Sequence, residues 1–237
     1  MKITFISDTH TMHSQVTEDL PGGDLLIHAG DCMNGGYRES ELIGFLDWME
    51  RDVKGYKHKL FIAGNHDWIF QNSPIQAREL VAKYAPSVEY LEDEMSCFNQ
   101  RLFNGYFGNG DVRIYGSPWQ PAFCDWAFNL PRNGEELIEK WNDIPDKIDI
   151  LVTHGPRYGY LDWAGSGGNV GCEALDSVIL TNPPKIHVCG HVHSGYGYKW
   201  DGNTHHINAS VLNNSYLYVN KPLNIEWDKE SNKIKFK

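Results

Sequence analysis

The chain has 237 residues, of which 41% are hydrophobic and 13% aromatic, so a large packed core is expected and disorder is not. Its net charge of −10 and the absence of a basic run exclude a surface built to coat polymeric nucleic acid. No apolar stretch approaches the roughly 18 residues of a membrane-spanning helix, so no membrane partner is expected. The five cysteines are scattered and odd in number, which indicates reduced thiols and a cytoplasmic location.

The first predicted strand covers residues 3–6 and runs into a polar segment that carries Asp8 and His10. Residues two apart on an extended chain point to the same side, so a carboxylate and an imidazole leave this strand end together. Both groups are common ligands of divalent metals. A single Asp-x-His tripeptide also occurs by chance in ordinary loops, so its weight depends on the rest of the chain.

Four later apolar runs also stop at Asp, Asn or His residues, as the first one does. We expect these strands near residues 24–29, 59–63, 148–152 and 185–189. They are followed by Asp31, by Asn65 and His66, by His154, and by His191 and His193. Open α/β sheets form their ligand sites at such strand ends. The spacing of apolar residues also predicts helices over residues 39–52, 73–84, 134–142 and 172–180.

The order of these elements predicts two different halves. Strands alternate with helices up to residue 80, which indicates a mainly parallel α/β half. Residues 88–115 read as short strands with turns, including a hairpin-like tip at 107–111, and three more strands are expected between residues 205 and 236. These segments favour a second, partly antiparallel sheet packed against the first. No repeat, linker or low-complexity segment divides the chain, so we expect one domain over residues 1–237.

The strand ends together supply eight polar side chains, most of them next to a glycine. Glycine lets the backbone turn sharply, so the neighbouring side chain can approach a shared centre. The mixture of carboxylate, carboxamide and imidazole favours Mn²⁺, Fe or Zn²⁺ over Ca²⁺ or a thiolate-bound structural Zn²⁺. The set is too large for one tetrahedral ion and suits two ions that share a carboxylate.

Five motifs in this set resemble those of the calcineurin-like metallophosphoesterases and follow that family's order. They are Asp8-Thr9-His10, Gly30-Asp31, Gly64-Asn65-His66-Asp67, His154 and Gly190-His191-Val192-His193. Three further segments resemble a branch of metallophosphoesterase-domain proteins with phosphodiesterase activity. These segments are Ser7-Asp8-Thr9-His10, Gly116-Ser117-Pro118-Trp119 and His154-Gly155-Pro156.

The resemblance implies an α/β fold of two mixed β-sheets sandwiched between helices, with two divalent metal ions at the strand ends. Manganese is favoured, with iron and zinc as the alternatives. One ion would be held by Asp8, His10, Asp31 and His193. The other would be held by Asp31, Asn65, His154 and His191. His66 would be the catalytic residue that contacts the phosphate, together with Asn65, or protonates the leaving oxygen.

The second motif departs from the protein phosphatases of this family, which carry Gly-Asp-x-x-Asp-Arg. This chain has Gly30-Asp31-Cys32-Met33-Asn34-Gly35. Asn34 can hydrogen-bond His66 but cannot stabilise an imidazolium by charge, and the arginine that grips phosphate is missing. Arg157 is the candidate replacement, with a surface role as its alternative. The departure argues against protein phosphatase activity and not against metal binding.

We therefore expect a phosphoesterase that hydrolyses small phosphodiesters, with cyclic nucleotides as candidates, by attack of a hydroxide activated by two metals. Two alternatives stay open: a non-catalytic metal- and phosphate-binding module, and a phosphomonoesterase or protein phosphatase. The aromatic residues of segment 119–128 are expected to pack as the base of a lid rather than to stack on a substrate. The sequence leaves the oligomeric state open.

Overall fold

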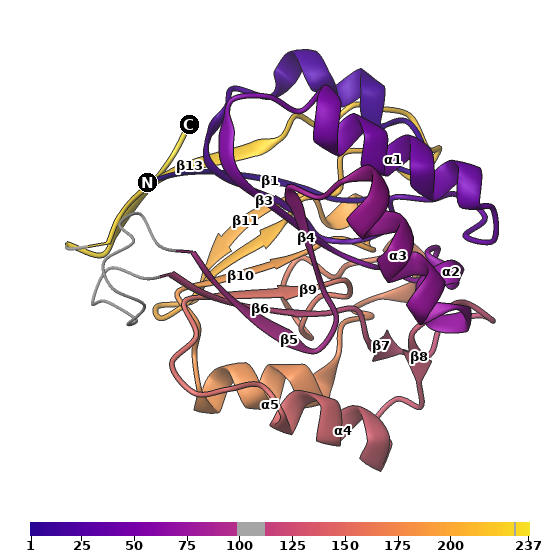
Figure 1. Ribbon diagram of the computed structural model, residues 1–237. Coiled ribbons are helices and arrows are strands. Elements are labelled where there is room, and N and C mark those ends of the chain that lie inside the picture. Colours follow the sequence, from indigo (N-terminus) through magenta and orange to yellow (C-terminus); the bar gives the residue numbers. More distant parts are fainter. Residues whose placement is uncertain (99–111, 230) are drawn as a thin grey trace.

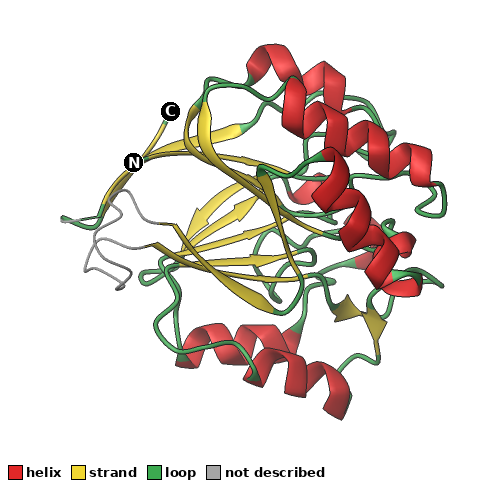
Figure 2. Ribbon diagram, viewed as in Figure 1, coloured by secondary structure: helices red, strands yellow, loops and turns green. Residues whose placement is uncertain are grey.

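The structure, a computed structural model, describes residues 1–98, 112–229 and 231–237 of the chain. The hairpin-like tip expected at residues 107–111 lies outside this described part. Figures 1 and 2 show two β-sheets lying face to face, with helices on both outer sides. Each sheet has six strands of mixed direction, so the expected fold of two mixed sheets between helices is confirmed. Among the described residues, every helix is too short or too polar to span a lipid bilayer.

The first sheet combines four parallel strands from the start of the chain with two antiparallel strands from its end. The parallel strands are β1 (Lys2–Ile6), β2 (Gly23–His28), β3 (Tyr56–Ile62) and β4 (Val88–Leu91). The tail strands β13 (Leu223–Asp228) and β14 (Lys233–Phe236) add to the edge at β1. Our expectation that the whole tail joins the second sheet is wrong for these two strands. Pairing with β1 places Ile225 and Trp227 in the apolar core between the sheets, which explains the choice.

The second sheet has parallel strands at its centre and antiparallel strands at both edges. The central strands are β6 (Val112–Ser117), β9 (Ile150–Thr153), β10 (Ile186–Cys189) and β12 (His205–Asn208). The edge strands are β5 (Glu94–Phe98) and β11 (Gly197–Trp200). This sheet is therefore partly antiparallel, as expected. A separate two-stranded sheet pairs β7 (Gln120–Pro121), near the start of the aromatic segment 119–128, with β8 (Asn129–Leu130), which follows that segment.

The helices cover the outer faces of the two sheets (Figure 1). The first sheet carries α1 (Glu39–Arg51), α2 (Trp68–Asn72) and α3 (Pro74–Tyr84). The second sheet carries α4 (Glu135–Asn142) and α5 (Glu173–Thr181). All four predicted helices are confirmed to within one residue at each end, whereas α2 and the strands β7, β8 and β11 were not predicted. Short 3₁₀ helices cover His13–Asp19, Gly165–Gly167 and His193–Gly195.

Successive side chains of a strand point to opposite faces of its sheet, so each apolar strand packs against both the other sheet and the outer helices. In β2, Leu25 and Ile27 face the core between the sheets, whereas Leu26 faces the helices on the outer side. Each fully buried apolar side chain of this kind contributes about 1.5–3 kcal/mol. The packing of the two sheets brings the carboxyl ends of β1, β2, β3, β9 and β10 to one edge of the molecule.

Candidate metal centre

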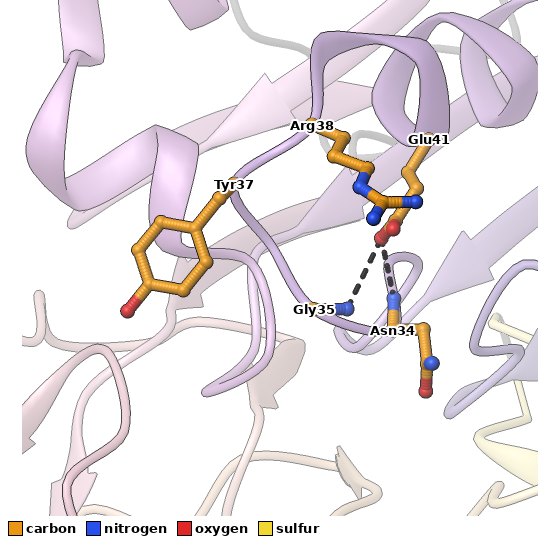
Figure 3. Close-up of a pocket in the computed structure, with 5 residues that line it drawn as sticks. All are labelled: Asn34, Gly35, Tyr37, Arg38 and Glu41. Carbon is orange, nitrogen blue, oxygen red and sulfur yellow. Dashed lines mark hydrogen bonds between the residues drawn. The ribbon is translucent and has the colours of Figure 1, made fainter.

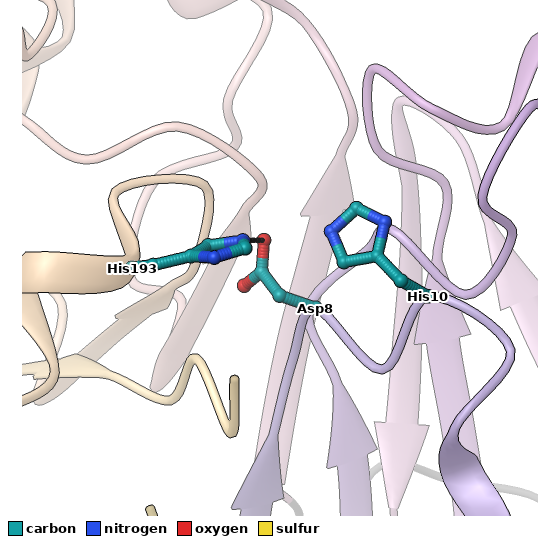
Figure 4. A group of neighbouring side chains, drawn as sticks. All are labelled: Asp8, His10 and His193. Carbon is teal, nitrogen blue, oxygen red and sulfur yellow. Dashed lines mark ion pairs between the residues drawn. The ribbon is translucent and has the colours of Figure 1, made fainter. Parts of the chain in front are cut away.

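Five strand ends bring all the predicted metal ligands into one cluster. Three overlapping groups have ligand atoms within 4.8 Å of one another: Asp8, His10 and His193; His10, Asp31 and His66; and Asp8, Asp31 and His154. Figure 4 shows the first group, with the rings of His193 and His10 on opposite sides of Asp8. The cluster therefore offers candidate sites for divalent metal ions.

The backbone adopts the left-handed conformation at four of the predicted ligands. The angle φ is +55° at Asp8, +39° at His10, +58° at Asp31 and +65° at His191. Such values are uncommon outside glycine and cost of order 1–3 kcal/mol each. Hydrogen bonds between the loops hold two of these residues, since Asp8 N donates to Gly30 O at 2.9 Å and His10 N donates to Asp31 O at 3.1 Å. Strained backbone of this kind is typical of functional sites.

Two glycines allow neighbouring strand ends to approach the carboxylates closely. A Cβ atom on Gly190 would overlap Ser7 and the Asp8 carboxylate. A Cβ atom on Gly64 would overlap Asp31 in the same way. Glycine beside the predicted ligands therefore permits the close approach that the sequence pattern indicated.

Three of the imidazole rings are oriented by the same kind of hydrogen bond to a main-chain carbonyl. His10 Nδ1 donates to Met33 O at 3.1 Å, His154 Nδ1 to Ala29 O at 2.9 Å, and His193 Nδ1 to Asn213 O at 2.9 Å. A carbonyl oxygen only accepts, so Nδ1 carries the hydrogen in each ring and Nε2 faces the site. Metal-binding histidines are held in this way, because the bond fixes both the tautomer and the ring orientation.

The Nε2 atoms of these rings face carboxylate oxygens. His154 Nε2 lies 3.3 Å from Asp31 Oδ2, and His193 Nε2 lies 3.4 Å from Asp8 Oδ1. His10 Nε2 lies 3.6 Å from Asp31 Oδ2, is buried, and has no hydrogen-bond partner among the described residues. A buried polar atom left unpaired is costly. A divalent cation between the imidazole nitrogen and the carboxylate would satisfy both, so the residues fit a metal.

Without a cation, two imidazoles carry the charge that balances the carboxylates. Burial lowers the pKa of His154, but the Asp31 carboxylate outweighs it and raises that pKa to about 9. Burial likewise opposes the charged form of His193, but its hydrogen bond with Asp8 raises the pKa to about 9. Burial lowers the pKa of His10 to about 4, so this ring is neutral near pH 7. His10 Nε2 is therefore not protonated near pH 7, and it cannot gain a partner by donating a hydrogen bond to Asp31.

Asp31 and Asn65 hold the central positions of the cluster. Asp31 Oδ2 is near both His10 Nε2 and His154 Nε2, while Asp31 Oδ1 accepts from His66 N at 2.7 Å. Asn65 Oδ1 lies 2.9 Å from His154 Nε2 and 2.8 Å from His191 Nδ1. Asp31 thus lies between the two sets of ligands named from the sequence, and Asn65 joins two imidazoles of the second set.

His66 is oriented by the main chain of Asn34 and by an aromatic ring. His66 Nδ1 donates to Asn34 O at 2.6 Å, and the His66 ring stacks on Trp126 with centroids 3.9 Å apart. The expected bond to Asn34 therefore exists, but it uses the carbonyl and not the side-chain amide. Glu41 fixes this loop by accepting from the main-chain N–H groups of Asn34 and Gly35. Figure 3 shows the Asn34 side chain directed away from Glu41.

Two buried polar residues that the sequence did not single out support the ligands. Asp67 accepts from the main-chain N–H groups of Asp31, Met33 and Gly64 at 3.0, 2.9 and 2.7 Å, and so ties two loops together. Burial and the neighbouring Asp31 raise the pKa of Asp67 to about 6. Ser210 Oγ donates to Asp8 Oδ2 at 2.8 Å. In the sequence, only position could have pointed to these residues. Asp67 is the last residue of the motif Gly64-Asn65-His66-Asp67, and Ser210 comes just after a strand.

Arg157 lies in a separate buried cluster. Its guanidinium pairs with Asp176 and, at 2.9 Å, with Asp201, and it lies 4.2 Å from the centre of the Tyr160 ring. Asp201 also accepts a hydrogen bond from His206 Nε2 at 2.9 Å. Arg157 is 1% exposed, so the alternative of a surface role is wrong. Its charge is already balanced by two carboxylates, so the structure gives no support for a phosphate-gripping role.

The aromatic segment 119–128 divides into packed and site-facing residues. Trp119 and Phe128 pack edge to face, as expected for the base of a lid. Trp126 instead stacks on His66, and Phe123, which is 57% exposed, lies edge-on to His191 at 5.9 Å. The expectation of packing alone is therefore incomplete, because two aromatic rings of this segment contact residues of the cluster.

Comparison with known proteins agrees with this geometry. Residues 1–195 match the calcineurin-like phosphoesterase family. The human protein named metallophosphoesterase domain-containing protein 1 is 42% identical over 233 residues, covering 93% of this chain and 69% of the human protein.

Two solved structures show the same fold at low identity. The protein TT1561 of Thermus thermophilus has a TM-score of 0.61 at 14% identity, covering 100% of this chain and 97% of that protein. Phosphopantetheinyl hydrolase (PptH) of Mycobacterium tuberculosis has a TM-score of 0.56 at 17% identity, covering 91% and 90%. With the family match and the human relative, these findings establish that the chain belongs to the calcineurin-like phosphoesterase family.

Proposed function

We propose that this chain is a metal-dependent phosphodiesterase that hydrolyses small phosphodiesters, with cyclic nucleotides among the candidate substrates. It would use two divalent ions, of which manganese is favoured. Asp8, His10, Asp31 and His193 would hold one ion. Asp31, Asn65, His154 and His191 would hold the other.

One observation carries this proposal: the position of Asp31 Oδ2 between His10 Nε2 and His154 Nε2. The Nδ1 bonds direct both Nε2 atoms toward the same anionic oxygen. His10 Nε2 carries no hydrogen, and His154 Nε2 would release its hydrogen when a metal binds. Cations on either side of this carboxylate would satisfy all three groups at once. A carboxylate shared between two ions is typical of sites that catalyse in-line displacement at phosphorus.

The chain's own residues would divide the remaining work. Bound divalent ions supply Lewis-acid stabilisation and a nucleophile at neutral pH. His66 would act on the leaving oxygen as the general acid, because the Asn34 carbonyl fixes its Nδ1 hydrogen and leaves Nε2 free to transfer a proton. Trp126 would hold the His66 ring by stacking.

The proposed preference for diesters rests on charge. A phosphomonoester carries two negative charges near neutral pH and a diester carries one, so a diester needs less positive charge from the protein. The arginine that the protein-phosphatase members carry is missing from the second motif, and Arg157 is neutralised by Asp176 and Asp201. The overall charge of −10 also gives a polyanion no basic surface to follow.

The test is a substrate panel on the purified chain supplied with Mn²⁺. Bis-p-nitrophenyl phosphate should be cleaved faster than p-nitrophenyl phosphate, and cyclic AMP faster than a phosphopeptide. Faster cleavage of the monoester and the phosphopeptide would contradict the diester proposal but leave the metal site standing. Tight metal binding with no turnover of any phosphoester would instead identify a binding module.

A further inference from the structure

We infer that Tyr216 is a substrate-contacting residue whose phenol donates a hydrogen bond to a non-bridging oxygen of the phosphoryl group. It would stand in for the arginine that the second motif lacks, as a neutral donor in place of a cation. The inference rests on the proposed phosphoesterase function. Nothing in the sequence pattern singled out this residue, which lies in the loop between β12 and β13.

Ring contacts place Tyr216 directly at the metal cluster. Its ring centroid lies 4.8 Å from that of His10 and 5.3 Å from that of His193, edge to face in both cases. These are two of the ligands proposed for the same ion. A tyrosine ring is long enough to carry its hydroxyl past the imidazole that it touches, toward a group bound at the metals.

Hydrogen bonds close the turn that carries Tyr216, and the same turn also binds the ring of His193, a proposed metal ligand. Asn213 O accepts from the main-chain N–H of Tyr216 at 2.8 Å and from His193 Nδ1 at 2.9 Å, so one carbonyl holds both the Tyr216 backbone and the His193 ring. The Asn213 side chain accepts from the N–H groups of Ser215 and Leu217. Leu212 bridges to Tyr218 across the base of the turn. Tyr216 is therefore held in place relative to His193 without contributing to the core.

Backbone strain and exposure both argue against a packing role. Tyr216 has φ of +56°, a conformation that is unfavourable for a bulky residue and that glycine or asparagine would adopt at lower cost. The residue is 39% exposed and so lies outside the buried core. The hydroxyl has no hydrogen-bond partner within the described part of the chain. A strained, exposed tyrosine with a free donor, whose ring contacts two residues of the metal cluster, is suited to contacting a ligand.

The chemistry matches the proposed substrate class. A neutral phenol stabilises developing negative charge on a phosphoryl oxygen through a hydrogen bond but adds no net charge. The site would then bind a monoanionic diester without the strong attraction for a dianion that a guanidinium provides. His66, whose ring also contacts that of His10 with centroids 4.6 Å apart, would serve the leaving oxygen.

The test compares Tyr216→Phe with a matched tyrosine variant in Mn²⁺-loaded protein. Tyr216→Phe keeps the ring on His10 and His193 and removes only the hydroxyl. We expect kcat/KM for bis-p-nitrophenyl phosphate to fall about tenfold, the effect of losing one hydrogen bond to charge. Binding of inorganic phosphate, measured by calorimetry, should weaken by a similar factor. Metal content and melting temperature should not change.

Tyr37→Phe is the matched control. Tyr37 is 66% exposed and lines a pocket of about 320 Å³ beside Asn34, together with Gly35, Arg38 and Glu41 (Figure 3). Its hydroxyl also has no hydrogen-bond partner among the described residues, but its ring stacks on Trp68 and not on the cluster. This variant should keep wild-type kcat/KM and wild-type phosphate binding.

Each outcome decides the inference. Wild-type kinetics and phosphate binding in Tyr216→Phe would overturn it. Loss of metal from that variant would also overturn it, because the hydroxyl would then act on the ligands and not on the substrate. If only Tyr216→Ala is impaired, the ring packs on the histidines and the hydroxyl has no role. If the wild type cleaves no phosphoester, the proposed function fails, and phosphate binding still decides the role of Tyr216.

Discussion

The chain contains two polar clusters of histidine and aspartate residues, the Arg157 cluster and the metal cluster, and they differ in how their charges are satisfied. In the Arg157 cluster, the guanidinium pairs with Asp176 and Asp201, and His206 forms a hydrogen bond with Asp201. Every strong charge there meets its opposite within the protein. In the metal cluster, Asp31 Oδ2 instead also faces the neutral ring of His10, whose only hydrogen lies on Nδ1 and is donated to Met33 O.

The difference shows that burial of histidine and aspartate does not by itself identify a site. Both clusters contain buried imidazoles and carboxylates with shifted pKa values. Only one of them leaves a buried nitrogen, His10 Nε2, without a partner among the described residues. The Arg157 cluster is complete as it stands and stabilises the second sheet. We propose that a cation completes the other, and this distinction can be tested with matched substitutions.

The largest expected effect comes from Asp31→Asn. Asp31 is the only carboxylate proposed to contact both ions, so its loss should weaken both sites and remove most turnover. The fall in rate should exceed the 10–100-fold that loss of a supporting residue costs. Metal content and hydrolysis of bis-p-nitrophenyl phosphate are the measurements. Wild-type rate and metal content in this variant would contradict the shared-carboxylate assignment.

Asp201→Asn is the matched control in the other cluster. It removes one partner of a buried ion pair, and such losses cost about 3–5 kcal/mol of folding stability. We expect a clear fall in melting temperature while the metal content stays at the wild-type value. Loss of metal from this variant would show that the two clusters are not independent.

His66→Asn should lower kcat by about 10²–10⁴ while both ions remain bound, because His66 is proposed as a general acid and not as a ligand. His66 also has a nitrogen within 4.8 Å of ligand atoms of His10 and Asp31, so a role as a metal ligand is the alternative that this variant tests. Loss of a metal, with the rate restored by excess Mn²⁺, would make His66 a ligand. A lower melting temperature with little change in rate would make it structural.

Asp67→Asn should have a smaller effect, about 10–100-fold on metal affinity. The carboxylate accepts main-chain hydrogen bonds from Asp31, Met33 and Gly64, and an amide has only one oxygen to accept them. Calorimetric titration with Mn²⁺ measures the change. Unaltered affinity would mean that the loops after β2 and β3 hold their positions without this residue.

The smallest effect is a release of protons when metal binds. The pKa values of His154 and His193 are raised to about 9 in the metal-free protein, and ligands must be neutral. At pH 7, metal binding should therefore release about two protons, and metal affinity should rise up to pH 9. Because these pKa values are above the unfolded value near 6.5, the stabilisation they provide is present below pH 6.5 and lost by pH 9. Calorimetry in buffers of different ionisation enthalpy counts the protons, and a count of zero would contradict the assignment.

The sequence predicted the parts of the site that follow directly from strand ends. Asp8, Asp31 and His154 could be placed because each comes just after a buried apolar run, and parallel strands end at one edge. The four helices followed from apolar spacing in the same way. The assignment of β13 failed because two sheets can accept an antiparallel edge strand, and only packing of Ile225 and Trp227 decides between them.

The residues that the sequence could not place depend on contacts between distant segments. Arg157 is neutralised by Asp201, which lies 44 residues away along the chain, and no local pattern indicates that pairing. In the sequence, Trp126 and Tyr216 cannot be told from aromatic residues of an ordinary core. Only the folded structure shows that the Trp126 ring contacts His66 and the Tyr216 ring contacts His10. The Asn34 carbonyl was missed because main-chain acceptors leave no trace in side-chain identity.

The number of divalent ions bound per chain tests the account most directly. The purified protein should be stripped with a chelator and titrated with Mn²⁺ by calorimetry, with elemental analysis of the dialysed product. We predict two ions per wild-type chain, and two in Asp201→Asn. A protein that binds no ion would contradict the interpretation of His10 Nε2 and Asp31, and a single ion would contradict the shared carboxylate.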